Sequence, residues 1–137
     1  MNIEDLQNAC KMSFLENIPL GMFNNASKVK NVNYIHQTNL NLRSIPHDYL
    51  SGLPNLESAY GAFSDCRNLI LNNAENIFKD SIKLTSLGSV FNGCIKANLS
   101  ITDGLFKNFH KVTNFESSFR RCLINGSISG GFLRNCY

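Results

Sequence analysis

Histidine and cysteine are the residue types in this chain best able to support catalysis or bind metal, so their spacing is the first test of function. The three histidines, His36, His47 and His110, lie far apart, and the sequence contains no Cys-x-x-Cys or His-x-x-x-His pair. Structural zinc sites are built from such closely spaced ligands. The nucleophile motif Gly-x-Ser-x-Gly and the phosphate-binding Gly-x-x-x-x-Gly-Lys-Ser/Thr are also missing. We therefore predict a protein that is not an enzyme and holds no metal or cofactor.

The cysteines indicate structure rather than reactivity. There are five of them, Cys10, Cys66, Cys94, Cys122 and Cys136, and the middle three are 28 residues apart. A disulfide framework would place its cysteines at varied spacings. A free buried cysteine instead behaves as a small apolar residue. We expect reduced thiols that form a file along a core.

Polar residues recur with the same period and form the candidate binding face. Two files of four are flanked by two tyrosines and a glutamate: Lys30, Glu57, Thr85 and Thr113; Asn31, Ser58, Ser86 and Asn114; Tyr34, Tyr60 and Glu116. Repeat proteins contact their partners through stacked positions of this kind. A polar ladder can also simply keep a sheet soluble, so a solvated face is the alternative.

A four-position frame positions these residues. It reads aromatic or apolar, two residues, small or Cys, two residues, Leu or Val, two residues, apolar. Phe63-x-x-Cys66-x-x-Leu69 and Phe78-x-x-Ser81-x-x-Leu84-x-x-Leu87 are clear copies. The frames start at Ala9, Phe23, His36, Leu50, Phe63, Phe78, Phe91, Phe106, Phe119 and Leu133. Alternate frames match best, which gives a period of 27 or 28 residues. This period places Phe63, Phe91 and Phe119 at one frame position, so we expect their rings to stack as a buried file.

A fixed period of this length predicts a solenoid, in which no unit buries its apolar side alone. The units fall near 18–44, 45–72, 73–100 and 101–127, with a partial unit at 128–137. Residues at i and i+3 come together in a short helical turn, and the Thr- and Ser-rich pieces favour short strands. The stripe Leu84, Leu87, Phe91 and Cys94 also fits an amphipathic helix, so an all-α helical-repeat array remains the alternative.

The two ends of the chain differ from the repeats. Ile3, Leu6 and Cys10 would share one face of a helix, and Asn2 could cap it. We therefore predict an N-terminal cap helix at 1–14, followed by the solenoid at 15–137. The last frame, around Leu133, has no unit after it to cover its apolar positions. We expect self-association through this C-terminal coil.

Two segments carry a family resemblance. The segments Ala62-Phe63-Ser64-Asp65-Cys66-Arg67-Asn68-Leu69 and Val90-Phe91-Asn92-Gly93-Cys94, with Leu42-x-x-Ile45-Pro46 between frames, resemble BspA-like leucine-rich repeats of bacterial surface proteins. The resemblance implies an α/β, leucine-rich-repeat-like solenoid of about four to five coils, with short strands, short helical turns and the N-terminal helical cap. The family unit is shorter, about 23 residues, within the general range for leucine-rich repeats.

The same resemblance implies a function. Such proteins are adhesion or recognition modules, so we expect a fragment of a larger bacterial surface protein that binds a protein or a glycan. It favours a location at the cell surface or outside the cell. The alternative is a structural or receptor-binding component of a phage tail or a similar assembly.

The overall composition limits the classes of partner that we expect. The chain has 137 residues, 43% hydrophobic content and a formal net charge of +3, with its charges spread along the sequence. Nucleic-acid binders gather their basic residues on one face, so we expect no nucleic-acid partner. No apolar run reaches about 18 residues, which argues against a membrane span. The opening residues have no apolar signal-peptide core.

Overall fold

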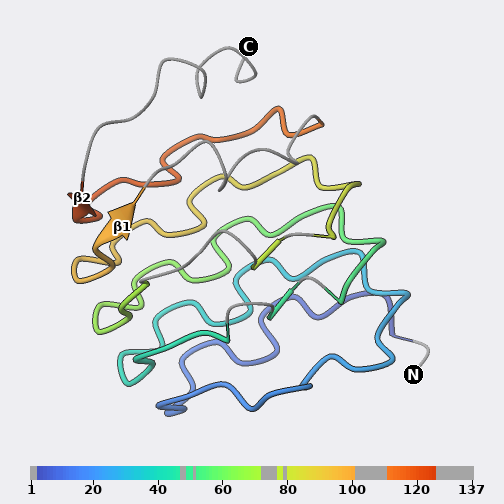
Figure 1. Cartoon of the computed structure of the whole chain (residues 1–137), viewed down its shortest axis with the longest axis horizontal. Helices are drawn as coiled ribbons and strands as arrows, with labels where there is room; N and C mark the ends of the chain where they lie inside the picture. Colours follow the sequence, from blue (N-terminus) through green and yellow to red (C-terminus); the bar gives the residue numbers. More distant parts are fainter. Residues whose placement is uncertain are drawn as a thin grey trace.

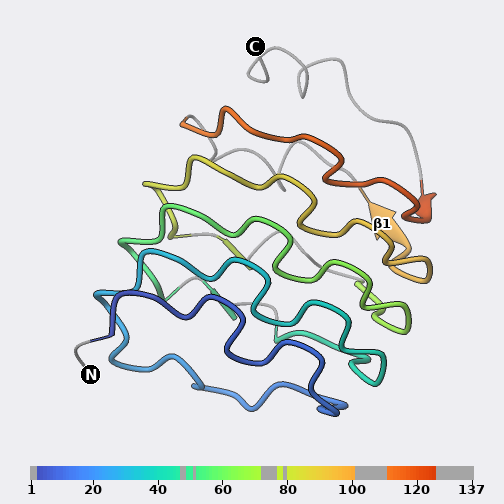
Figure 2. The ribbon, with the colours of Figure 1, turned by 180° about the vertical axis from the view of Figure 1, so that it is seen from behind.

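The chain folds into stacked layers. The computed structural model describes residues 3–46, 49–50, 52–71, 77–78, 80–100 and 111–125. Within them, five turn-rich front segments lie one above the next, at residues 3–17, 29–44, 56–71, 84–99 and 112–125 (Figure 1). The view from behind, in which these front segments lie nearest the viewer, shows the same order, from dark blue to orange-red (Figure 2). Returning segments such as 18–28 connect one front segment to the next.

Neighbouring front segments are paired in parallel, over stretches of just one or two residues. Single parallel bridges join five equivalent residues in series: Asp5, Asn31, Ser58, Ser86 and Asn114. Strand β1 (Leu99–Ser100) and strand β2 (Ile124–Asn125) make a two-residue parallel ladder, with Leu99 opposite Ile124. The described residues contain no longer strand and no helix.

The predicted fold class is therefore wrong. An α/β leucine-rich-repeat-like solenoid requires helical turns and a strand in every coil, whereas the described residues have no helix and just two strands of two residues each. The alternative, an all-α helical-repeat array, is wrong for the same reason. The cause is the period of three: the chain changes direction at successive apolar positions, before either regular element can extend.

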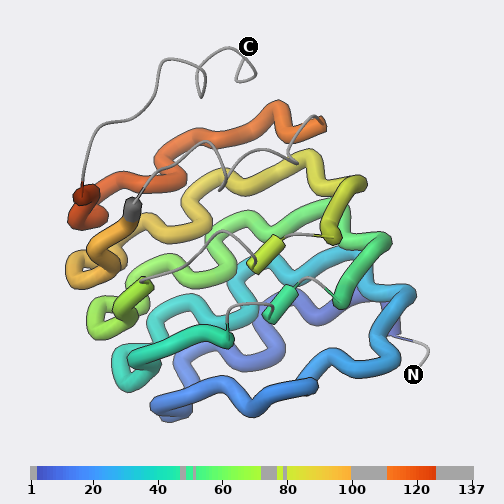
Figure 3. The backbone as a smooth tube through the Cα atoms, in the orientation of Figure 1, coloured from blue at the N-terminus to red at the C-terminus, as the bar shows by residue number. Residues whose placement is uncertain are grey.

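In most of the described frames the first two steps are turns, each closed by a hydrogen bond from residue i+3 to residue i, whereas the last step is extended and carries the parallel bridge. Within one layer, the Cys66 N–H donates to the Phe63 carbonyl at 3.1 Å, and the Leu69 N–H donates to the Cys66 carbonyl at 3.1 Å. In many of these turns the third residue has a positive φ, as a type II turn requires. Asp65 is one such residue, with φ of 58°. The repeated turns give the backbone its wavy path (Figure 3).

Equivalent turns are bonded to each other through their middle peptides. The N–H of Tyr34 donates to the Tyr60 carbonyl at 2.8 Å, and that of Gly61 donates to the Gly88 carbonyl at 2.8 Å. The N–H of Ser89 continues the series to Glu116 at 2.7 Å. A second series runs through Thr38, Asp65 and Gly93, whose N–H groups donate to carbonyls of the next layer. These hydrogen bonds satisfy backbone groups that a turn would otherwise leave unpaired.

The N-terminal segment is the first layer, so the predicted cap helix at 1–14 is wrong for the described residues 3–14. Hydrogen bonds from Ala9 to Leu6 and from Ser13 to Cys10 close turns there. The Cys10 N–H donates to the carbonyl of Ile35 at 2.9 Å, which makes Cys10 the equivalent of His36. The first frame thus starts one residue later than its predicted position at Ala9.

An aromatic stack runs through the core along the layers. The rings of Phe63 and Phe91 are stacked at 5.7 Å between centroids, and those of Phe91 and Phe119 at 6.3 Å. The predicted phenylalanine file is confirmed. His36 extends the stack, 5.7 Å from Phe63 and at an interplanar angle of 11°. Phe63 and Phe91 are at most 2% exposed, so the stack lies in the hydrophobic core.

The cysteine position contributes a hydrogen bond as well as volume. The thiols of Cys66, Cys94 and Cys122 donate to backbone carbonyls of the preceding layer, at 3.1, 3.0 and 2.8 Å. These cysteines are free, and burial raises the pKa of Cys66 to about 12 and that of Cys122 to about 11. Their protonated form is the one that can donate, so the elevated pKa and the hydrogen bond agree.

Asparagine side chains join the layers elsewhere. The amides of Asn55 and Asn68 donate to the carbonyls of Ser27 and Leu40, each at 2.8 Å. Asn39, which is fully buried, donates to the Leu15 carbonyl at 3.0 Å. Buried or edge carbonyls that lack a strand partner need such donors. The abundance of asparagine in the sequence therefore has a structural role.

Several sequence predictions fall outside the described residues. They concern His47, His110, Cys136 and the C-terminal coil at 128–137 with its proposed self-association through Leu133.

Truncation of the central phenylalanine should reveal how much the aromatic stack stabilises the fold. We expect Phe91→Ala to lower the free energy of unfolding by about 3–5 kcal/mol, because the layers above and below prevent the cavity from collapsing. Urea denaturation followed by circular dichroism measures this. The matched control is Ile82→Ala, because Ile82 is 63% exposed and should lose less than about 1 kcal/mol. A loss below about 1 kcal/mol for Phe91→Ala would show that the stack is not a stabilising core.

Candidate partner-binding face

The eleven residues of the predicted face lie together on the front segments, and none of them is buried. Backbone hydrogen bonds align the first file: Glu57 N–H to the Lys30 carbonyl, Thr85 to Glu57, and Thr113 to Thr85, at 2.8, 2.9 and 3.0 Å. The parallel bridges align the second file, from Asn31 to Asn114. We call the surface formed by these eleven residues the front face.

Lys30 has a partner within the protein. Its Nζ lies 3.0 Å from Oε2 of Glu4, and this hydrogen bond is the main cause of a raised pKa for Lys30. Both side chains are about half exposed or more, so the pair contributes little to stability. It does neutralise the charge at this margin of the front face.

Several amides of the front face brace the layers. The Asn31 amide donates to Oδ2 of Asp5 and to Oε1 of Gln7, each at 3.3 Å. Its Oδ1 accepts a hydrogen bond from the Asn33 N–H at 2.8 Å. Such local side-chain to backbone bonds are typical of asparagine in turns. Asn31 is therefore a bracing residue as well as a surface residue.

Asn33 holds the backbone at Tyr60. Its Oδ1 accepts a hydrogen bond from the Ser58 hydroxyl at 2.6 Å and another from the Tyr60 N–H at 2.7 Å. The position of Tyr60 is therefore fixed by two interactions from the layer before it, this one and the turn ladder.

The tyrosine pair is the most distinctive part of the front face. The rings of Tyr34 and Tyr60 contact each other edge to face, with centroids 5.6 Å apart and an interplanar angle of 66°. Each ring lies on a glycine of the next layer. A Cβ added to Gly61 would come 2.6 Å from the Tyr34 ring, and one added to Gly88 would come 2.6 Å from the Tyr60 ring. The glycines thus make room for the rings, which remain partly exposed.

The N-terminal layer contributes four residues to this site that the sequence patterns did not identify. Lys11 Nζ lies 5.9 Å from the centroid of the Tyr34 ring, a cation–π distance. Glu4, Asp5 and Gln7 contact the front face as described above. They were left out of the predicted face because residues 1–14 were expected to form a cap helix rather than a layer. Aligning Asp5 with Asn31, 26 residues later, would have placed all four in the first layer.

The comparisons with known proteins give no family. The chain matches no protein-family model, and no curated protein matches it. Among the described residues there is no helix long and apolar enough to cross a membrane. No group of three or more His, Cys, Asp or Glu side chains in the same part of the chain is arranged to hold a metal ion.

A second cluster lies inside the protein, at His36. Nε2 of His36 is 2.6 Å from the Tyr49 hydroxyl, which lies 3.7 Å from Sδ of Met22. Both contacts are satisfied when Nε2–H donates to the tyrosine oxygen and the tyrosine O–H donates to the sulfur. Nδ1 of His36 is then a buried acceptor, and it has no hydrogen-bond partner in the described structure. Burial lowers the pKa of His36 to about 4.

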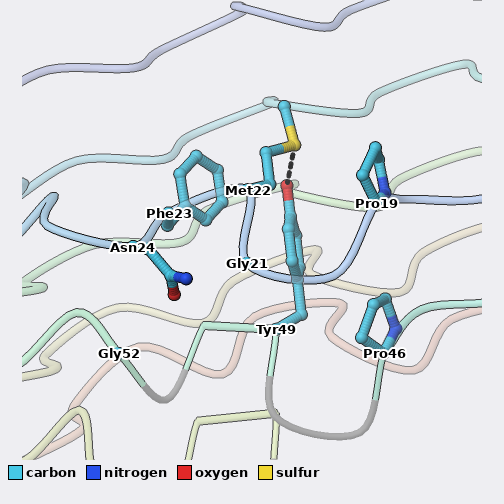
Figure 4. A pocket seen from close by; sticks show the side chains of 8 residues that line it. All are labelled: Pro19, Gly21, Met22, Phe23, Asn24, Pro46, Tyr49 and Gly52. Atoms are coloured by element: carbon cyan, nitrogen blue, oxygen red, sulfur yellow. Dashed lines mark hydrogen bonds between the residues drawn. The ribbon is translucent and has the colours of Figure 1, made fainter.

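A small open pocket of about 110 Å³ adjoins this cluster on the returning segments. It is lined by Pro19, Gly21, Met22, Phe23, Asn24, Pro46, Tyr49 and Gly52. Figure 4 shows the Tyr49 ring between the two prolines and Phe23, with its hydroxyl pointing to Met22. Burial raises the pKa of the Tyr49 hydroxyl, so it stays protonated. The cluster is therefore a neutral packing unit.

The contact between the Tyr34 ring and Gly61 can be tested by substitution. We expect Gly61→Ala to lower the free energy of unfolding by more than about 1 kcal/mol, since φ is +59° and the new Cβ would clash with Tyr34. Thermal and urea denaturation measure the loss. Gly52→Ala is the control, because nothing lies within 4 Å of its added Cβ. Introducing Gly61→Ala into a Tyr34→Ala background should cost less, and equal costs in both backgrounds would show that the ring does not rest on Gly61.

The free energy of unfolding should decrease as the pH is lowered, because of His36. Its pKa is about 6.5 in the unfolded chain and about 4 when folded, so only the unfolded state takes up the proton between these values. The contribution is complete above pH about 6.5 and decreases by about 3 kcal/mol as the pH falls to about 4. His36→Phe, which copies the residue at Phe63, should remove this decrease. Urea melts of both proteins across the range provide the difference, and parallel pH profiles would exclude His36 as the cause.

Proposed function

We propose that this chain is a non-enzymatic recognition module that binds its partner through the front face, with Tyr34 and Tyr60 at the centre of the contact. The observation that carries the proposal is the seating of these two partly exposed rings on Gly61 and Gly88. A ring that is already held in place loses little conformational entropy when a partner binds, which favours affinity.

The composition around the rings supports the same proposal. The front face is rich in Tyr, Asn and Ser, with glycines beneath the rings. Evolved binding surfaces favour this set because tyrosine supplies rigid amphipathic area while Asn and Ser supply adaptable hydrogen bonds. Tyrosine is also enriched among the residues that dominate binding energy at interfaces.

The chemistry of the reactive groups supports a role without catalysis. Burial raises the pKa of all four described cysteines, so their thiols stay protonated and are poor nucleophiles. His36 is fully buried and hydrogen-bonded to Tyr49. Cys66, Cys94 and His36 are buried and therefore not accessible to a substrate, whereas Cys10 and Cys122 are partly exposed.

The motif resemblance to BspA-like repeats adds a context to the proposal. The motifs around Phe63 and Phe91, which carry it, build the aromatic stack and the cysteine file beneath the front face. We therefore propose adhesion or recognition at a bacterial cell surface or outside the cell, with a protein or a glycan as ligand.

An array of extracellular proteins and glycans tests the proposal. The face variant combines Tyr34→Ser and Tyr60→Asn, because Ser89 and Asn33 occupy the equivalent positions of other layers and the fold accommodates them. The control is Ile70→Asn, a substitution at an exposed residue (49%) at the far end of a front segment. We expect the wild type and the control to bind a common ligand that the face variant loses. Absence of any ligand, or equal binding by all three proteins, would contradict the proposal.

A further inference from the structure

The tyrosine rings lie against the surface rather than protruding from it. Each ring lies across a glycine backbone of the next layer, and Lys11 lies over the Tyr34 ring, yet both rings remain partly exposed. Protein hot spots characteristically insert a side chain into a pocket of the partner. The pocket described above is lined by the returning segments, away from the two rings. A flat, braced aromatic surface suits a ligand that is itself a flat ring with an apolar side.

The polar groups around the rings suit an uncharged ligand that is rich in hydroxyl groups. The Ser58, Ser86 and Asn114 side chains provide hydroxyl and amide groups along the second file. The carboxylates of Glu57 and Glu116 are exposed at the rim and can accept hydrogen bonds from hydroxyls. Like-charge repulsion from these carboxylates disfavours sulfated or acidic ligands.

The nearby cations do not make the front face favourable for acidic ligands. Lys30 is paired with Glu4 at 3.0 Å, and Lys11 lies over the Tyr34 ring. Both are therefore engaged within the protein. A polyanion such as a nucleic acid would need a cluster of free basic groups, which the front face lacks among the residues described.

We propose that Tyr34 and Tyr60 form the stacking platform for a neutral glycan built of pyranose rings. A pyranose has an apolar C–H side that can lie on an aromatic ring and equatorial hydroxyls that reach the surrounding amides and carboxylates. The inference rests on the proposed recognition function and specifies its ligand class. The two rings, 5.6 Å apart and at 66°, would contact different faces or neighbouring units of the glycan.

Titration with soluble neutral oligosaccharides tests this inference on the full chain. The probes are cellohexaose, maltohexaose and chitohexaose, measured by calorimetry and by tyrosine fluorescence, since the chain contains no tryptophan. We expect at least one of them to bind, and Tyr34→Ser or Tyr60→Asn to weaken it by about tenfold or more through the lost ring contact. Tyr34→Phe keeps the ring and should stay within about threefold. Ile70→Asn should bind like the wild type.

Salt and folding controls make the result decisive. Binding of a neutral glycan should change less than about twofold between about 0.05 and 0.5 M salt, since screening acts on charges. Urea melts of each variant separate a lost contact from a lost fold. If the array ligand is a protein and no oligosaccharide binds, the glycan inference is wrong while the recognition function stands. Oligosaccharide binding that ignores both tyrosine substitutions, or that falls steeply with salt, also overturns the inference.

Discussion

The hydrogen bond between the middle peptides of equivalent turns is the interaction on which this structure depends. In a four-residue β-turn the middle peptide is free to bond outside the turn. Here it bonds to its counterpart one period later, as from Tyr34 to Tyr60 and from Gly61 to Gly88. This requires a positive φ at residues such as Thr38 and Arg121, where an L-residue is disfavoured by about 1–2 kcal/mol. The ladder and the packed core beneath it hold these residues in place, as expected where surrounding structure determines a strained backbone.

The remaining features follow from that ladder. Because each layer repeats the path of the one below, like side chains lie above one another, and the aromatic stack and the cysteine file result. Because sheet pairing in the described part of the chain is limited to single bridges and one two-residue ladder, many carbonyls there need other donors. Thiols such as Cys94 and amides such as Asn68 supply them. The side-chain choice at these positions is therefore set by hydrogen bonding as much as by hydrophobicity.

The sequence alone predicted the period, the alignment of the polar files and the stacking of Phe63 on Phe91. It did not predict the local backbone, because apolar residues spaced by three fit a short helix as well as successive β-turns. The residues with positive φ include Met12, Tyr34 and Thr38, which carry no turn signal in the sequence. The partner of His36 could not be predicted either, because Tyr49 reaches it from a returning segment. For the proposed binding face a signal was present: a glycine follows each tyrosine one period later.

Tyr34 has both an unusual backbone conformation and a place at the centre of the proposed binding face. Its φ of 55° belongs to the left-handed region, and the equivalent positions in other layers are Asn8, Gly61, Ser89 and Ser117. Asparagine and glycine tolerate this conformation, whereas a bulky residue there is an outlier. Stability would favour a smaller side chain at this position, yet the chain places an aromatic ring there and a glycine beneath it. Strain that the fold could readily avoid is an indication of function. The same reasoning does not apply to Phe63 or Phe91, which the core alone explains.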